Sequence, residues 1–167
     1  MKISFLIASG LALALAGLLS YLLLTLISSG FRRKHYAEGA PNLAQGLVLA
    51  GKLLAGLILV SGVFGPLRDY LLITAGGKEV LSWALFSFLL LCCCVAGVAY
   101  VLVSAFEGFL SGRVFKGRSL VVELAENNVG VGVVRAVLVV GLAVVFLFSM
   151  SVFIQAFIPV PAVVSIR

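Results

Sequence analysis

Charged residues are scarce in this chain, and those present are mostly gathered between long apolar stretches. Only 11% of the 167 residues are Asp, Glu, Lys or Arg, whereas 63% are hydrophobic. A soluble domain typically carries about 25% charged and about 45–50% apolar residues. A water-soluble fold of this composition would expose too much apolar surface, so the sequence predicts an integral membrane protein.

The residue types that build catalytic and metal sites are also scarce. The single histidine, His35, lies in a basic segment without neighbouring ligand residues, so we expect it to be solvated. The three cysteines, Cys92, Cys93 and Cys94, are adjacent in an apolar run and lack the spacing of a zinc or redox motif. They are typical of packing residues.

No enzyme motif is recognisable in the sequence. It contains no paired carboxylates, no Ser/His or Cys/His arrangement in a suitable context, and no glycine pattern of a nucleotide-binding loop. We therefore expect no enzymatic activity, no catalytic residues, no metal and no cofactor. The net charge of +6 comes from short clusters between apolar runs, a pattern that favours topology signals over a nucleic-acid surface.

Four apolar segments are each long enough to cross a bilayer, which takes about 20 residues in a helix. We predict spans at Ile3–Ser28, Leu43–Phe64, Leu81–Leu110 and Val129–Ile158. The first exceeds the roughly 7–15 apolar residues of a cleaved signal, so we expect it to be retained. A strand in the Val-rich fourth segment would leave its backbone unsatisfied in lipid, which favours a helix.

The second span is predicted to stop at Gly65-Pro66, a helix-ending pair, which places Arg68 and Asp69 in the next loop together with Lys78 and Glu79. The fold class is then all-α, a polytopic membrane protein with four transmembrane helices arranged as two tandem helical hairpins. The whole chain, 1–167, forms one membrane domain, with hairpins at 3–64 and 81–158.

The distribution of Lys and Arg predicts an orientation. Loops one and three each contain three of these residues, loop two contains two, and each terminus contains one. Because positive charge concentrates on the cytoplasmic side, loops one and three are predicted to be cytoplasmic and both termini outside.

A shift of 86 residues places the start of the second span on the start of the fourth. The matched pairs are Asn42 and Asn128, Gly46 and Gly132, Val48 and Val134, and Ala50 and Ala136. Either the hairpin is repeated in parallel, or the match arises by chance in Gly-, Ala- and Val-rich sequence. The repeat is favoured because both asparagines stand where a helix starts, and Asn is a preferred N-cap.

The two small-residue pairs, Gly46/Ala50 and Gly132/Ala136, are spaced four residues apart. Such pairs lie on one helix face and allow a second helix to approach closely. We predict that they pack against other helices, within the chain or between subunits.

With four spans and two hairpins, the segments Asn42–Gly56 and Asn128–Gly141 resemble the domain-of-unknown-function 350 (YjfL-like) family of bacterial inner-membrane proteins. The resemblance extends over roughly Gly10 to Phe157. It implies a helical fold in the bacterial inner membrane and no established activity. The chain departs from the family pattern in carrying Lys52 and Arg135 inside the two segments.

Three ionisable residues fall within the predicted spans: Lys52, Glu107 and Arg135. A charge at the centre of a membrane helix costs at least about 2.5–3.5 kcal/mol, so such residues usually face protein or water. Lys52 is ten residues beyond Asn42, about 15 Å along a helix. We predict that it points into protein or a water-filled cavity, and that Glu107 neutralises Arg135 or Lys52. Snorkelling to the headgroups is the alternative.

Two functions fit these features. The first is a membrane scaffold or partner subunit, for which the resemblance suggests envelope maintenance or stress response. The second is an oligomeric ion channel or small-solute transporter that uses Lys52, Glu107 and Arg135. The expected partners are the lipid bilayer and either further copies of the chain or another membrane protein, with no nucleic acid.

Overall fold

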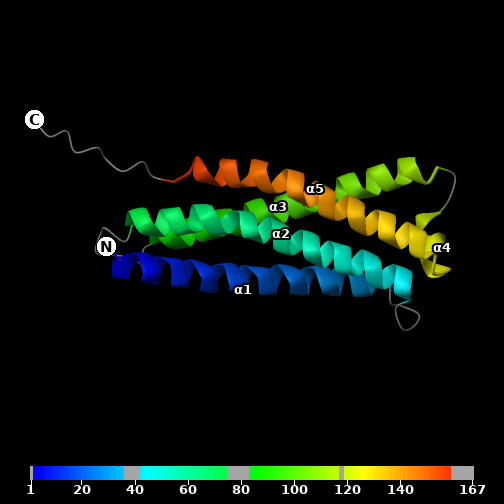
Figure 1. Cartoon of the computed structure of the whole chain (residues 1–167), viewed down its shortest axis with the longest axis horizontal. Helices are drawn as coiled ribbons and strands as arrows, with labels where there is room; N and C mark the ends of the chain where they lie inside the picture. Colours follow the sequence, from blue (N-terminus) through cyan, green and yellow to red (C-terminus); the bar gives the residue numbers. More distant parts are fainter. Residues whose placement is uncertain (1, 36–41, 75–82, 117–118, 159–167) are drawn as a thin grey trace, which may run out of the picture.

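The computed structural model of the chain describes residues 2–35, 42–74, 83–116 and 119–158. Its regular structure, within these ranges, is entirely helical, which confirms the all-α prediction. The helices are α1 (Lys2–His35), α2 (Leu43–Thr74), α3 (Trp83–Val114), α4 (Leu120–Ala125) and α5 (Val129–Gln155). Figure 1 shows the four long helices lying along one another, with α4 at one end.

The four long helices each contain a segment apolar enough to cross a membrane, as predicted. Their outward faces carry large apolar side chains such as Leu22, Phe86, Val98 and Phe148, all of them exposed. A bilayer supplies the apolar solvent that such faces require.

The prediction that the second span stops at Gly65-Pro66 is wrong. α2 continues through Pro66 to Thr74, and Pro66 is buried. Proline removes one backbone hydrogen bond, but in a membrane helix the neighbouring helices and local adjustments satisfy the freed carbonyl group. Arg68 and Asp69 therefore lie on the helix, where Arg68 Nη2 is 2.8 Å from Asp69 Oδ1.

The other helix boundaries also differ from those predicted. α1 continues through Arg32 and Arg33 to His35, and α4 forms within the segment expected to be the third loop. The rest of the predicted second loop, which includes Lys78 and Glu79, lies outside the described residues.

The core of the bundle is the pair α2 and α5, which pack most extensively against each other and start at the same end. Two glycines allow the close approach. A Cβ atom added at Gly51 would lie 2.7 Å from Ala136 Cα, and one added at Gly132 would lie 2.8 Å from the carbonyl oxygen of Ala44. The two helix backbones are thus in direct contact, as small residues permit.

The register of this contact is close to the shift that relates the two sequence segments. Gly132 lies 88 residues after Ala44, and Ala136 lies 85 residues after Gly51, on either side of the 86-residue shift. Two parallel helices related by an axis along their length bring equivalent positions together. The register is therefore what a parallel repeat requires, while the repeat and the tandem hairpins remain predictions.

The predicted packing pairs behave differently within the chain. Gly132 is buried against Ala44, and Ala136 contacts Gly51. Gly46 has open space where a side chain would project, and Ala50 is exposed, so this pair does not pack within the chain, and its packing between subunits stays a prediction. The reason is angular: at 100° per residue, positions 46 and 50 point away from the face that carries Ala44 and Gly51.

α1 and α3 pack on this central pair. α1 runs antiparallel to α2, and Ile27 fills the space beside Gly56. α3 contacts both α5 and α2, and its Phe88 ring stacks on Tyr70 of α2 with centroids 4.2 Å apart.

We predict that Gly132→Val lowers the thermal stability of the detergent-solubilised protein, because its methyl groups would overlap the backbone of α2. Overpacking of this kind costs about 1–3 kcal/mol. The matched control is Gly141→Val on the same helix, where nothing lies within 4 Å of the added Cβ. Equal melting temperatures for the two variants would contradict the close contact.

Candidate functional site

The two asparagines predicted to start helices make capping hydrogen bonds. Asn42 Oδ1 accepts from the backbone N–H of Gln45 at 2.9 Å, and Asn128 Oδ1 accepts from that of Val131 at 3.3 Å. The amide groups of both reach α4 or its side chains. Asn42 Nδ2 donates to the carbonyl oxygens of Leu124 and Ala125 at 2.6 and 3.1 Å, and Asn128 Nδ2 donates to Glu123 Oε2 at 2.6 Å.

A third asparagine completes this junction. Asn127 adopts φ 58°, a left-handed conformation that Asn tolerates better than most residues, and it ends α4. Its Oδ1 accepts from the backbone N–H of Ala44 at 3.0 Å. The first turn of α2 has backbone N–H groups without partners inside the helix, and the last turn of α4 has such carbonyl groups. Asn42 and Asn127 supply hydrogen-bond partners for both. This fixes α4 against the starts of α2 and α5.

Two of the three predicted in-membrane charges form a buried ion pair. Arg135 Nε donates to Glu107 Oε1 at 2.5 Å, and Arg135 Nη2 donates to Glu107 Oε2 at 3.1 Å. Ser111 Oγ, one turn along α3, donates to Glu107 Oε1 at 3.0 Å. The two charged side chains are only 2% and 12% exposed. Such a two-pronged arrangement is the strongest form of Arg–carboxylate contact, and it joins α3 to α5.

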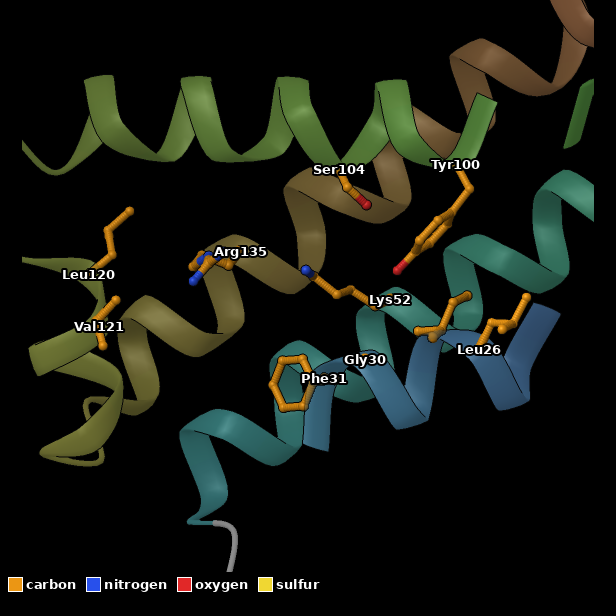
Figure 2. Close-up of a pocket in the computed structure, with 10 residues that line it drawn as sticks. Leu26, Gly30, Phe31, Lys52, Tyr100, Ser104, Leu120, Val121 and Arg135 are labelled. Atoms are coloured by element: carbon orange, nitrogen blue, oxygen red, sulfur yellow. The ribbon is translucent and has the colours of Figure 1, made fainter. Parts of the chain in front are cut away.

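A cavity of about 360 Å³ lies beside this ion pair and is bounded by all five helices. Its lining residues are Leu26, Ile27, Gly30, Phe31, Lys52, Tyr100, Ser104, Leu120, Val121 and Arg135. Figure 2 shows the Lys52 ammonium between Arg135 on one side and the hydroxyl groups of Ser104 and Tyr100 on the other. The apolar residues of α1 and α4 form the remaining wall.

Lys52, the third predicted charge, thus points into this cavity, which is partly open to the outside. Its Nζ lies 5.9 Å from the centroid of the Phe31 ring, within the range of a cation–π contact. Ser104 Oγ is buried and has no hydrogen-bond partner among the described residues. A hydroxyl group in that situation can donate to a ligand in the cavity.

The depth of Lys52 in the membrane stays a prediction, but the first turns of α2 lie beyond the end of α1, which bears on it. Ile27 is level with Gly56 and Phe31 with Lys52, so Arg32 and Arg33 come within one turn of the lysine. At the other end of α2, Arg68 lies sixteen residues after Lys52, about 24 Å along the helix. The hydrocarbon layer is about 30 Å thick, so we expect Lys52 and Arg68 to lie near its two boundaries.

The chemistry available at the site is recognition rather than bond making. The lining holds two cations and two hydroxyl groups, and the carboxylate of Glu107 neutralises Arg135. The described residues contain no group of three or more His, Cys, Asp or Glu side chains that could hold a metal ion. The sequence did not predict that Ser104 and Tyr100 line this cavity, because a single hydroxyl residue in an apolar helix produces no periodic pattern.

We predict that breaking the ion pair is more harmful than removing it. Glu107→Leu or Arg135→Leu alone leaves one charge buried without its partner, which typically costs about 3–5 kcal/mol. The double variant should retain more stability than either single one in a thermal-unfolding cycle in detergent. The partly exposed pair Arg68 and Asp69 is the control, where the same cycle should give about 0–1 kcal/mol. Additive effects at Glu107 and Arg135 would contradict the pairing.

Substitutions of Asn127 separate its two roles. Asn127→Gly removes the hydrogen bond to the backbone N–H of Ala44 but keeps the left-handed backbone accessible, so it should cost about 1 kcal/mol. Asn127→Ala loses the same hydrogen bond and also strains the backbone, which adds about 1–2 kcal/mol. The expected order of melting temperatures is wild type, then Gly, then Ala. If Ala is at least as stable as Gly, the backbone assignment is incorrect.

Comparison with known proteins places this chain in a family. The family model described as Domain of Unknown Function (DUF350) matches residues 2–150, a range that includes Lys52, the ion pair and all the lining residues of the cavity. No curated protein and no solved structure matched the chain. The match agrees with the resemblance found from the two Asn-led segments, and the chain belongs to the DUF350 family.

Proposed function

We propose that the protein is a membrane scaffold or partner subunit, whose fixed helical bundle presents apolar faces to other membrane proteins. The observation that supports this most directly is the closed interface between α2 and α5. A Cβ atom added at Gly51 or Gly132 would overlap backbone atoms of the other helix. A bundle whose central helices are in backbone contact is suited to holding a shape, since its axis leaves no room for a conducting path.

The outer face of α3 supports association with a second helix. Gly108 and Gly112 are exposed, four residues apart, and nothing lies within 4 Å of a Cβ built at either position. The ring of Phe109, the residue after Gly108, is also exposed. Small residues between larger ones form a groove that admits another helix closely. The proposed partner is a second copy of the chain or another membrane protein.

In this proposal the protein resides in the bacterial inner membrane with loops one and three in the cytoplasm and both termini outside. Arg32, Arg33, Arg113 and Lys116 support that orientation, since all four are exposed at the same end of the bundle. A role in envelope maintenance or stress response is part of the proposal and rests on the family resemblance alone.

The second candidate is an oligomeric ion channel or small-solute transporter. The charged cavity favours it, because ionisable residues within membrane-spanning helices often mark the path of a solute or ion. Four helices enclose little space, so a pore would have to form between several subunits.

We predict that the purified protein is oligomeric in nanodiscs and that Gly108→Leu with Gly112→Leu shifts it toward the monomer. The added side chains would fill the groove on α3. Gly141→Leu, on an exposed site of α5, is the matched control and should leave the assembly unchanged. Mass photometry measures the distribution of species.

The same preparations separate the two candidate functions. The scaffold proposal expects liposomes that contain the wild-type protein to show no ion flux above empty liposomes. Flux that disappears with Lys52→Leu while the protein remains folded would replace the scaffold with the channel. A monomeric wild type that also fails to recruit any membrane partner would contradict the scaffold.

A further inference from the structure

The cavity beside Arg135 combines cationic and hydroxyl groups with apolar side chains. Lys52, Tyr100 and Ser104 supply an ammonium and two hydroxyl groups in its middle part. The apolar lining comes from Leu26 and Ile27 of α1 and from Leu120 and Val121 of α4, and Figure 2 shows Leu120 and Val121 beyond Arg135. A ligand that fits both must carry an anionic head and an apolar part.

The charged groups described at the cavity are Lys52, Arg135 and the carboxylate of Glu107 beside it. Glu107 already engages Arg135 through both of its carboxylate oxygens and also accepts from Ser111. Of the three charges contributed by Lys52, Arg135 and Glu107, two are positive and one is negative. The buried hydroxyl group of Ser104, which has no partner among the described residues, adds a donor. This combination favours an oxyanion with several acceptor oxygens.

The height of the cavity in the bundle matches the position of lipid phosphates. Lys52 is level with Phe31, one residue before the exposed pair Arg32 and Arg33 that ends the first apolar span. Lysine and arginine side chains at this level interact with headgroups at the membrane boundary. A lipid phosphate can therefore reach the cavity without leaving the plane of its leaflet.

From these observations we propose that the cavity binds the phosphate of an anionic phospholipid. The ammonium of Lys52 and the hydroxyl groups of Ser104 and Tyr100 contact the phosphate oxygens, and an acyl chain or glycerol backbone lies against Leu120 and Val121. The volume of about 360 Å³ accommodates a headgroup and the first part of a chain. This inference goes beyond the scaffold proposal and does not depend on it.

A lipid fits the lining better than free phosphate does. Inorganic phosphate would satisfy the polar side but would leave the leucine, isoleucine and valine side chains facing water. Burial of apolar surface against an acyl chain contributes about 25 cal/mol per Å² in addition to the ionic contacts. The short helix α4, held in place by Asn42 and Asn127, provides two of these apolar residues.

The test is native mass spectrometry of the detergent-solubilised full chain titrated with phosphatidylglycerol, with phosphatidylcholine as the zwitterionic comparison. The wild type should retain phosphatidylglycerol preferentially. Lys52→Gln should weaken its retention about tenfold, the loss expected for one charge-assisted hydrogen bond. Ser104→Leu, which fills the cavity and keeps the lysine, should also weaken it and serves as the second variant if Lys52→Gln does not fold.

Lys116→Gln is the matched control, because Lys116 is an exposed cation at the same end of the bundle that does not line the cavity. It should retain the lipid as the wild type does. Equal loss in Lys116→Gln and Lys52→Gln would mean general attraction of anionic lipid, and the proposal would fail. Failure of the wild type to prefer phosphatidylglycerol would also overturn it.

A competition arm distinguishes the lipid from a free anion. Inorganic phosphate and glycerol 3-phosphate are added to the lipid-bound protein, and displacement at concentrations comparable with the lipid would assign the cavity to a soluble phosphate and overturn the lipid proposal. The spectra also report the oligomeric state. Loss of lipid with an unchanged assembly leaves the scaffold proposal intact, so the two proposals fail separately.

Discussion

The contact between Glu107 and Arg135 governs the position of α3 in this bundle. Glu107 is the only charged side chain among the described residues that is almost fully removed from solvent, at 1% exposure. A carboxylate so placed is tolerated only when its charge and its lone pairs are engaged, and Arg135 and Ser111 do both. Most of the outer surface of α3 is apolar and exposed, so apolar packing alone specifies its rotation weakly. The ion pair selects one rotation and one height.

The remaining architecture supplies the frame in which that pair can form. Arg135 is adjacent to Ala136, whose contact with Gly51 fixes α5 against α2. The asparagine junction holds α4 under the start of both helices. As a result, the guanidinium group of Arg135 is directed toward α3 and the ammonium of Lys52 toward the cavity. The cavity is therefore the space left between an ion-paired α3 and a closely packed α2 and α5.

Much of this fold follows from local sequence signals. Long apolar runs predict membrane helices because lipid leaves the backbone no other way to satisfy its hydrogen bonds, and Asn42 and Asn128 mark helix starts through their capping chemistry. The end of α2 was mispredicted at Pro66, because the free-energy cost of a proline inside a helix depends on the helices packed around it. The depth of Lys52 counted from the start of its own helix differs from the depth expected from the end of α1, which lies beside it.

The site was only partly predictable for the same reason. Glu107 and Arg135 are conspicuous in apolar sequence, but the choice between Arg135 and Lys52 as partner depends on helix rotation, which no single helix encodes. Ser104, Tyr100 and the apolar residues of α4 become one lining only through tertiary packing. The close contact at Gly51 was not predicted, because the small-residue spacing of Gly46 and Ala50 predicts a packing face on the opposite side of α2.

The central claim is that Glu107 and Arg135 are in direct contact within the membrane-embedded bundle. Solid-state nuclear magnetic resonance tests this in lipid bilayers, by measuring the dipolar coupling between the ¹⁵N-labelled guanidinium of Arg135 and the ¹³C-labelled carboxylate of Glu107. The N···O contacts of 2.5 and 3.1 Å predict a strong coupling that disappears in Glu107→Leu. A wild-type spectrum without this coupling would contradict the account.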